Sequence, residues 1–352
     1  MKKILTILVS IILAIVVGFG FMFRKEISTM LSIKKIDDYG FYSIDVQSDY
    51  YLDELVAAGG AETDGELVSF LVSNIMRGLP IEFNIPDFGC STFQVQNKEG
   101  DWLFGRNYDL NPIPSMLVKT QPEDGYRSIA IANANVIGLE VNQEKLSLMQ
   151  RVMSLASPYV MMDGLNEKGL SIGVLLIKDE ATNQMTSKPD LTTTSMMRLV
   201  LDKAQNVQEA IEIFEAFDMH ASSGASYHFQ ITDAAGDSVI IEYIDNEISV
   251  IEKESDAYQY LTNFLVSEAK YGFGKGHDRY EVIKETLNDK NGVLSETEAM
   301  DLLKEVSQDD PAGGTTQTQW SVVYNNTDLT LDVVINNNFD TVYSYTFEEL
   351  FK

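Results

Sequence analysis

Short strand candidates separated by turns, with helices inserted in two blocks, constrain the fold of this chain more than any other feature. Extended apolar and alternating runs predict strands, and longer stretches with helical periodicity predict helices. The predicted strands cover residues 128–134, 159–165, 170–177, 226–232, 238–243, 248–252, 319–324, 329–334 and 341–347. The predicted helices cover residues 194–204, 207–217, 278–287 and 296–306, with capping-box patterns at Asn206-x-x-Glu209 and Ser295-x-x-Glu298. This order predicts an α+β fold of mainly antiparallel sheets packed beneath helical outer layers.

An apolar stretch opens the chain. Lys2 and Lys3 precede twenty uncharged and mostly apolar residues, 4–23, which Arg24 and Lys25 follow. A helix of that length, at about 1.5 Å per residue, just spans a hydrocarbon core about 30 Å thick. The run is longer than a usual signal-peptide core and no small-residue cleavage site closes it, so we expect an uncleaved anchor through residues 4–23. A cleaved signal with a secreted product is the alternative; in both cases we expect the folded domain outside the cell membrane.

Turn-forming residues mark one internal boundary. Two short amphipathic helices fit residues 52–77, and glycines and prolines between 78 and 89 end that segment. We therefore divide the chain into an anchor or signal (1–25), a leader (26–89) and a main domain (90–352).

The charge balance narrows the range of partners. Lysine and arginine number 26 against 53 aspartates and glutamates, which gives a formal charge of −27. Such a field repels nucleic acid phosphates and anionic lipid headgroups, so we expect no nucleic acid partner. With three scattered histidines and one cysteine, a zinc site is not supported, and we expect neither a metal nor a cofactor.

Cys90 is the only cysteine, so the chain has no intrachain disulfide. A single thiol in an exported protein is exposed to oxidation, so a functional role would explain its presence. An inert buried cysteine is one interpretation. The flanking residues favour another, because Cys90 opens a predicted hairpin whose second strand ends in Gly105-Arg106-Asn107-Tyr108-Asp109.

This hairpin resembles the nucleophile segment of the choloylglycine hydrolase family. In that family an arginine and an aspartate follow the cysteine after sixteen and nineteen residues, and here 106 − 90 = 16 and 109 − 90 = 19. The resemblance implies a four-layer αββα sandwich and an N-terminal nucleophile whose free α-amine is its own base. It therefore also implies cleavage of the bond before Cys90, because only cleavage frees the α-amine of the residue that carries the thiol.

The hairpin's turn sets an expected register. A two-residue turn at Glu99 and Gly100 pairs residues whose numbers sum to 199, which places Cys90 opposite Asp109 on one face. Arg106 would then point to the other face, unless a bulge at Gly105 turned it inward.

Three further segments extend the resemblance. Asp163-Gly164-Leu165-Asn166-Glu167-Lys168-Gly169-Leu170 is similar to a family turn whose asparagine, here Asn166, contributes to the oxyanion hole. Leu261-Thr262-Asn263 resembles the strand end that supplies the other oxyanion donor, Asn263, although Phe264 follows where the family often has proline. Arg279 resembles an arginine at the start of a family helix. The plain alternatives are a hairpin turn for the first segment and a solvated arginine for the last.

The resemblance implies an enzyme that hydrolyses small N-acyl amides at a linear C–N bond through a Cys90 thioester, with catalytic residues Cys90, Arg106, Asp109, Asn166, Asn263 and Arg279. Acyl transfer to an amine through the same thioester is one alternative, and a surface binding protein that keeps the fold without catalysis is another. A cysteine–histidine protease would need a partner among His220, His228 and His277, and no orienting group marks any of them. The sequence does not choose the amide or the oligomeric state.

Overall fold

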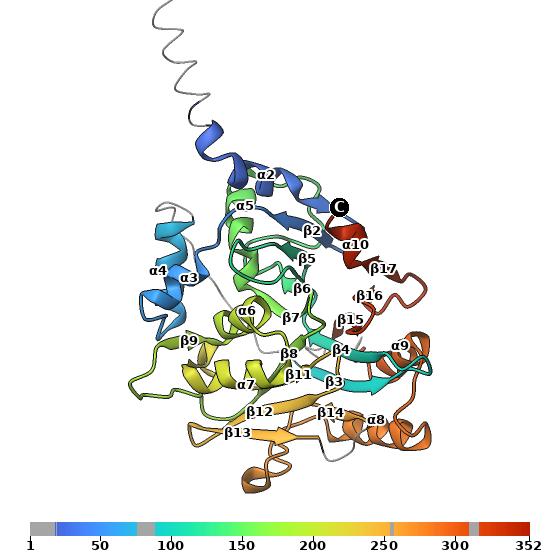
Figure 1. The fold of residues 1–352 in the computed structure, drawn as a ribbon. Helices are drawn as coiled ribbons and strands as arrows, with labels where there is room; N and C mark the ends of the chain where they lie inside the picture. The colour runs from blue at the N-terminus through green and yellow to red at the C-terminus, as the bar shows by residue number, and fades with distance from the viewer. Residues whose placement is uncertain (1–17, 19, 76–88, 254–256, 310–316) are drawn as a thin grey trace, which may run out of the picture.

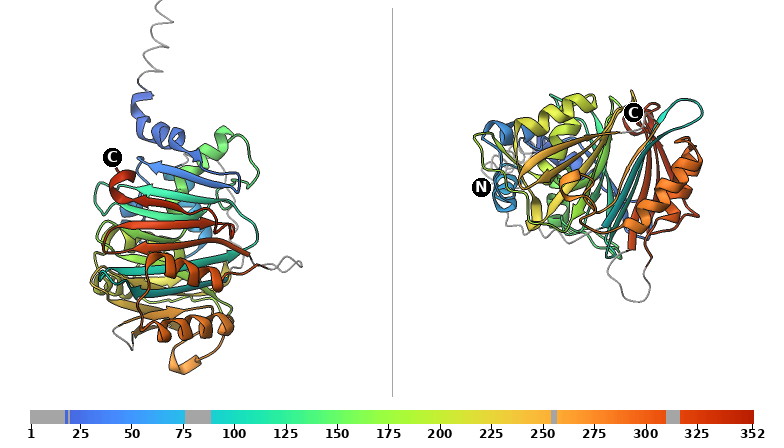
Figure 2. Two further views of the ribbon diagram at one scale, coloured as in Figure 1. Left: turned by 90° about the vertical axis from the view of Figure 1, so that its right-hand side faces the viewer. Right: turned by 90° about the horizontal axis from the view of Figure 1, so that it is seen from below.

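The computed structural model describes residues 18, 20–75, 89–253, 257–309 and 317–352, and it contains two large β-sheets that face each other (Figures 1 and 2). The predicted α+β class with mainly antiparallel sheets is confirmed. Within those described ranges, no helix is both long and apolar enough to cross a membrane. Most of the predicted anchor, residues 4–23, lies outside them.

The larger sheet has nine strands in the order β1-β2-β5-β6-β7-β8-β11-β12-β13. Only β2 and β5 pair in parallel; the other neighbours are antiparallel. The strands are β1 (Lys34–Lys35), β2 (Phe41–Val46), β5 (Ser115–Thr120), β6 (Ser128–Asn133), β7 (Met161–Asn166), β8 (Ser171–Ile177), β11 (Ser226–Thr232), β12 (Ser238–Ile244) and β13 (Glu247–Glu252). Two short strands, β9 (Asp190–Thr192) and β10 (Asp218–His220), form a separate parallel pair.

The smaller sheet carries the Cys90 hairpin and has six antiparallel strands in the order β14-β3-β4-β15-β16-β17. They are β14 (Gln259–Leu261), β3 (Gly89–Gln96), β4 (Trp102–Leu110), β15 (Gln317–Asn325), β16 (Thr330–Ile335) and β17 (Tyr343–Thr346). Helices α8 (His277–Asp289) and α9 (Glu296–Glu305) pack on its outer face (Figure 2, right). The short helix α10 (Phe347–Leu350) follows β17.

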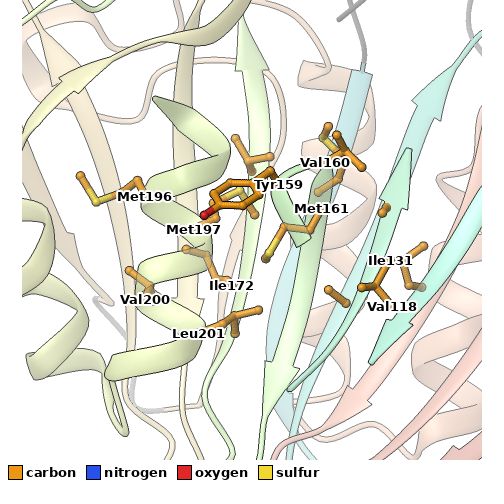
Figure 3. Close-up of a cluster of buried hydrophobic side chains, with 14 of the residues drawn as sticks. Val118, Ile131, Tyr159, Val160, Met161, Ile172, Met196, Met197, Val200 and Leu201 are labelled. Atoms are coloured by element: carbon orange, nitrogen blue, oxygen red, sulfur yellow. The ribbon is translucent and has the colours of Figure 1, made fainter. Parts of the chain in front are cut away.

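Helices α6 (Thr193–Lys203) and α7 (Val207–Ala216) pack against the larger sheet on its outer side. Figure 3 shows Met197 and Leu201 on the side of α6 that faces Met161 and Ile172 of the sheet, and all of these side chains are buried. Apolar residues on one face of a helix must be covered, so this packing fixes α6 on the strands that approach Cys90 from the opposite sheet.

The leader is part of this core. Its strand β2 pairs with β5, and its helices α3 (Leu52–Ala57) and α4 (Asp64–Asn74) bury Leu52, Leu55 and Leu67. The Tyr50 hydroxyl donates a 2.6 Å hydrogen bond to Asp202 at the end of α6, and both side chains are buried. The leader is therefore held to the main domain by strand pairing, apolar burial and a buried hydrogen bond. Helix α2 (Arg24–Ser32) precedes β1.

The predicted register of the Cys90 hairpin is wrong by one residue. Cys90 pairs with Tyr108, and Gly89 pairs with Asp109, so paired numbers sum to 198. The loop has three residues, Lys98 to Gly100, because Gly100 adopts φ +97°, a left-handed conformation that suits a three-residue hairpin loop. A shift of one residue moves every side chain to the other face. Arg106 therefore lies on the same face as Cys90 without any bulge at Gly105.

Most predicted elements are present with shifted ends. At Ser295 both hydrogen bonds of the predicted capping box form. At Asn206 only one forms: the Asn206 side chain accepts from Glu209 N, but the Glu209 carboxylate accepts from Gln205 N. The region predicted as a strand from 159 begins as a 3₁₀ helix (Ser154–Tyr159) that follows α5 (Leu148–Met153), and α10 takes the end of the segment predicted at 341–347.

The leader's contribution to stability can be measured. Tyr50→Phe deletes the donor to buried Asp202, so we expect the free energy of unfolding of the full chain to fall by about 1–3 kcal/mol in denaturant titrations. Tyr39→Phe, at a half-exposed tyrosine of the same leader, is the control and should change it by less than about 0.5 kcal/mol. Equal unfolding midpoints for both variants and wild type would show that the leader is not held through Tyr50.

Candidate active site

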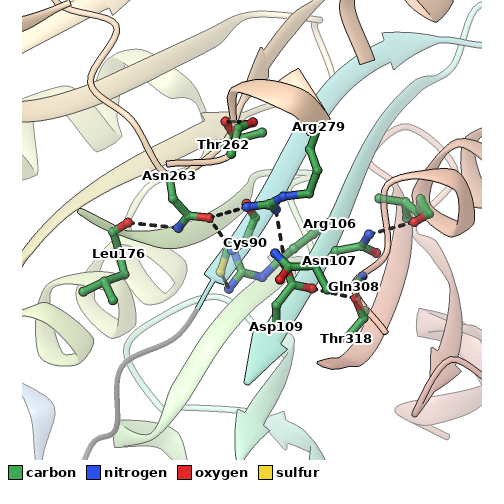
Figure 4. A network of polar contacts seen from close by, with 12 residues as sticks. Cys90, Arg106, Asn107, Asp109, Leu176, Thr262, Asn263, Arg279, Gln308 and Thr318 are labelled. Atoms are coloured by element: carbon green, nitrogen blue, oxygen red, sulfur yellow. Dashed lines mark hydrogen bonds and ion pairs between the residues drawn. The ribbon is translucent and has the colours of Figure 1, made fainter. Parts of the chain in front are cut away.

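Cys90 lies at the start of β3 with its side chain directed toward the larger sheet, and it is fully buried (Figure 4). Its Sγ lies 3.6 Å from the backbone oxygen of Val174 on β8 and 3.4 Å from Nη2 of Arg106. The observed hairpin register produces this contact, since Arg106 lies two positions before Tyr108, the residue paired with Cys90, and on the same face. The thiol therefore has a guanidinium as its nearest charged neighbour.

Asp163 fixes the position of Arg106. The Arg106 Nε lies 2.7 Å from Oδ2 of Asp163, and both side chains are fully buried. Asp163 also accepts hydrogen bonds from Trp320 Nε1 at 2.9 Å and from the Tyr324 hydroxyl at 2.6 Å. From the sequence, Asp163 was expected only as part of the turn around Asn166. The signal that could have identified it is a carboxylate within a predicted apolar strand, because a buried charge requires a partner.

Asn263 and Arg279 hold the backbone of Cys90. The Cys90 N–H donates to Asn263 Oδ1 at 2.6 Å, and Arg279 Nη1 donates to the Cys90 carbonyl oxygen at 2.6 Å. Arg279 Nη2 donates to the same Asn263 oxygen at 2.9 Å, while Asn263 Nδ2 donates to Leu176 O at 2.9 Å. Gly276 makes room for this arginine, because a Cβ there would lie 2.7 Å from Nη2 of Arg279. The two residues thus come together as expected, with the oxygen of Asn263 toward Cys90.

Asp109 pairs with Gly89 across the hairpin and not with Cys90. Its Oδ1 accepts from the Thr318 hydroxyl at 2.6 Å, and its Oδ2 accepts from Gln308 Nε2 at 3.0 Å and Arg279 Nη1 at 3.2 Å. A register irregularity between Thr318 and Trp320 in β15 lets Thr318 pair with Asp109. Thr318 and Gln308 were missed, since about two hundred residues separate them from Asp109 and no motif marks them.

Asn166, expected at the oxyanion hole, lies outside this cluster. Its Nδ2 donates to Leu201 O at 3.0 Å and Ala204 O at 2.7 Å, and its Oδ1 accepts from Lys168 N and Leu170 N. These bonds close the turn between β7 and β8 and attach it to the end of α6. β8 reaches Cys90 through Val174 and Asn263 through Leu176 instead. The plain hairpin-turn interpretation therefore describes the segment around Asn166.

The histidines are engaged elsewhere. His228 Nδ1 lies 3.0 Å from buried Glu242, His220 Nε2 lies 2.7 Å from Asp190, and His277 stacks on Phe264. None of these partners is Cys90, which argues against a cysteine–histidine pair. Over the described ranges, no three histidine, cysteine or carboxylate side chains gather as metal ligands.

Burial controls the charge of the thiol. It raises the pKa of Cys90 to about 12, although Arg106 and Arg279 oppose this rise by favouring the thiolate. Burial likewise raises the pKa of Asp109, against the opposing effect of Arg279. With Gly89 still attached, desolvation of the thiol outweighs the effect of a guanidinium that is already paired with Asp163.

The chain matches known proteins over this region. A model of the linear amide C–N hydrolases, choloylglycine hydrolase family, matches residues 90–291, which is more than half of the chain, and the match starts at Cys90. A penicillin V acylase of Pectobacterium atrosepticum is 36% identical over 112 residues, which span 29% of this chain and 29% of that relative.

Two solved structures share the fold. A mutant of the conjugated bile acid hydrolase from Clostridium perfringens superposes with a TM-score of 0.52 at 14% identity, covering 74% of this chain and 93% of that one. A second variant of the same hydrolase gives 0.52 at 13% identity with the same coverage.

The raised pKa of the Cys90 thiol predicts slow alkylation of the uncut chain. In uncut chains, which mass spectrometry separates from cut ones, the Cys90 thiol should alkylate at pH 8 roughly a thousandfold slower than an exposed thiol, because only the thiolate reacts and its fraction falls tenfold per pKa unit. The reference thiol comes from Met185→Cys in the same chain, since Met185 is 77% exposed. Comparable rates at the two positions would mean that Cys90 is neither buried nor neutral in the uncut protein.

Proposed function

Because this chain belongs to the choloylglycine hydrolase family of linear amide C–N hydrolases, we propose that Cys90 is its nucleophile and forms a thioester with the acyl group of a small N-acyl amide. One observation carries the proposal: side chains from β4, from the end of β14 and from α8 converge on Cys90, namely Arg106, Asp109, Asn263 and Arg279. The family match that starts at Cys90 supports the same assignment. The αββα sandwich of N-terminal-nucleophile hydrolases is the fold that we propose for these layers.

The base in this proposal is the α-amine of Cys90 after cleavage of the Gly89–Cys90 bond. A free α-amine has a pKa near 8, which suits proton transfer at neutral pH. Asn263 Oδ1, which accepts from the Cys90 N–H at 2.6 Å, would then accept from the amine and direct its lone pair toward the thiol. The amine takes the thiol proton, the sulfur attacks the amide carbon, and the proton passes to the leaving amine. Water then hydrolyses the thioester, with the same amine as base.

Arg106 supplies positive charge to the sulfur. At 3.4 Å from Sγ it stabilises the thiolate as the proton leaves, and Asp163 keeps it there without itself touching the sulfur. The bond of Asn263 Nδ2 to Leu176 O favours a role for this residue in orienting the amine over a role as an oxyanion donor. Arg279 holds the Cys90 carbonyl in place during the reaction, and Asp109 positions Arg279.

We further propose that the leader stays bound after cleavage and that the apolar residues 4–23 anchor the enzyme, with its folded domain outside the cell. The β2–β5 pairing and the Tyr50–Asp202 hydrogen bond support the first point, since neither depends on the Gly89–Cys90 bond. The relatives act on penicillin V and on conjugated bile acids, as their names state; for this chain we propose the wider class of small N-acyl amides.

Maturation tests the proposed nucleophile. Cys90→Ala should leave one uncut chain without activity, because no thiol is available to attack the Gly89 carbonyl and none to form the thioester. Ser91→Ala is the matched control, at the next buried residue, and should yield a fragment that begins at Cys90. Intact mass and N-terminal sequencing read both results; a Cys90→Ala chain that is cut and active would remove Cys90 from the mechanism.

The role of Asn263 is tested by two substitutions. Asn263→Ala should lower kcat by a hundredfold or more, about 3 kcal/mol of transition-state stabilisation, with the melting temperature nearly unchanged. Asn263→Asp retains an oxygen toward the amine and should recover at least about tenfold of that loss. If the aspartate variant is as inactive as the alanine variant, Nδ2 and not Oδ1 is the important atom; a loss below about threefold for alanine excludes Asn263 from the site.

A further inference from the structure

Exposed apolar side chains gather at the end of the molecule where α2 and α5 lie. Leu31 on α2 is 70% exposed, and Leu148 and Met149 at the start of α5 are 74% and 44% exposed. Arg151 of α5 donates to the backbone oxygen of Met30 at 2.8 Å, so the two helices are in direct contact. Figure 1 and the left view of Figure 2 show both helices at one end, above the sheets. No sheet or helix named above covers these three side chains.

The segment that enters this end carries a charge opposite to that of the chain as a whole. Residues 20–35 contain Arg24, Lys25, Lys34 and Lys35 with Glu26 as the only acid, although the formal charge of the chain is −27. An anionic surface therefore repels most of the molecule and attracts this end, which orients it. Lys25 pairs with Glu123, and Lys35 pairs with Asp38, so acids also lie nearby and part of the attraction is screened.

A cavity of about 300 Å³ lies between residues 33–42 and 143–151 at this end. Lys35, Lys145 and Arg151 line it together with one acid, Glu144. Its apolar lining comes from Ile33, Tyr42 and Leu146. A space with more cations than acids and an apolar floor suits the phosphate of a lipid headgroup above the start of its acyl chains.

The sequence gives the direction of approach. The apolar residues 4–23 lead directly into α2, so a bilayer that holds them meets the α2 end of the folded domain first. Leucine and methionine beside lysines is the composition of surfaces that lie at the boundary between headgroups and acyl chains. Lysines there extend their charged ends to the phosphates.

We propose that the end formed by α2, residues 138–149 and α5 lies on the surface of a phospholipid bilayer. Leu31, Leu148 and Met149 enter the headgroup boundary, and Lys35 and Lys145 contact lipid phosphates. These contacts hold the folded domain in one orientation on the membrane, whereas a domain attached only through its N-terminal segment would rotate freely. The proposed membrane contact does not depend on which residue is the nucleophile.

Site-specific labelling of the full chain tests the orientation. Cys90 is the only cysteine of the chain, so in a Cys90→Ala background a fluorophore attaches only at Leu148→Cys. The control is Tyr271→Cys, at a residue that is 66% exposed in the loop between β14 and α8 at the opposite end (Figure 1). In vesicles of phosphatidylcholine and phosphatidylglycerol that carry nitroxide lipids, we expect quenching and a blue shift at position 148 and neither at position 271.

A charge variant completes the test. Lys35→Gln with Lys145→Gln should lower the ratio of docked to undocked label at position 148 by about fivefold per lysine, from the usual attraction of a basic residue to an anionic surface. The matched control, Lys188→Gln, removes an exposed lysine near β9 and should change nothing. Equal quenching at positions 148 and 271 overturns the proposal. So does a label at 148 that is shielded only as protein density rises and is not quenched by lipid, since a second copy of the chain would then cover this surface.

Discussion

The buried ion pair between Arg106 and Asp163 is the interaction on which the rest of this site depends. Arg106 belongs to the smaller sheet and Asp163 to the larger one, so the pair joins the two sheets at the level of Cys90. Trp320 and Tyr324 satisfy the remaining acceptor positions of Asp163. Removing one partner of such a pair typically costs about 3–5 kcal/mol, because the other charge stays buried. The two sheets therefore cannot separate or shift without leaving one of these buried charges unpaired. The pair in this way keeps the guanidinium of Arg106 beside the sulfur of Cys90.

The same arrangement explains why Cys90 is protonated while Gly89 remains attached. Arg106 shares its charge with Asp163, and burial raises the pKa of the thiol to about 12. In our proposal the missing element is the α-amine, which cleavage would place within reach of Asn263 and the sulfur. The residues that hold the Cys90 backbone, Asn263 and Arg279, already occupy their positions in the uncut chain. Cleavage would thus complete a prearranged site, and the leader, paired through β2 and Tyr50, has contacts that outlast the cut bond.

The sequence predicted the α+β class and the segments that bring Cys90, Arg106, Asn263 and Arg279 together, because spacing within a motif survives however the rest of the chain folds. It failed where one local conformation decides the outcome. Gly100 in the left-handed region lengthens the hairpin loop by one residue, which reversed the expected face of Arg106. It also failed where partners are distant: the contacts of Asp109 with Thr318 and Gln308 depend on a strand irregularity near the end of the chain. Asn166 is the opposite case, since the motif match implied a chemical role, whereas in the structure the turn and the end of α6 take the hydrogen bonds of that side chain.

Trapping the acylated enzyme tests the central claim most directly. An active preparation is mixed with an N-acyl amide that it hydrolyses, quenched in acid within one turnover, and its fragments are weighed and sequenced. The account predicts an acyl group in thioester linkage on a fragment whose first residue is Cys90, released by hydroxylamine. An active enzyme whose Cys90 still follows Gly89, or whose acyl group is attached to any other residue, would contradict it.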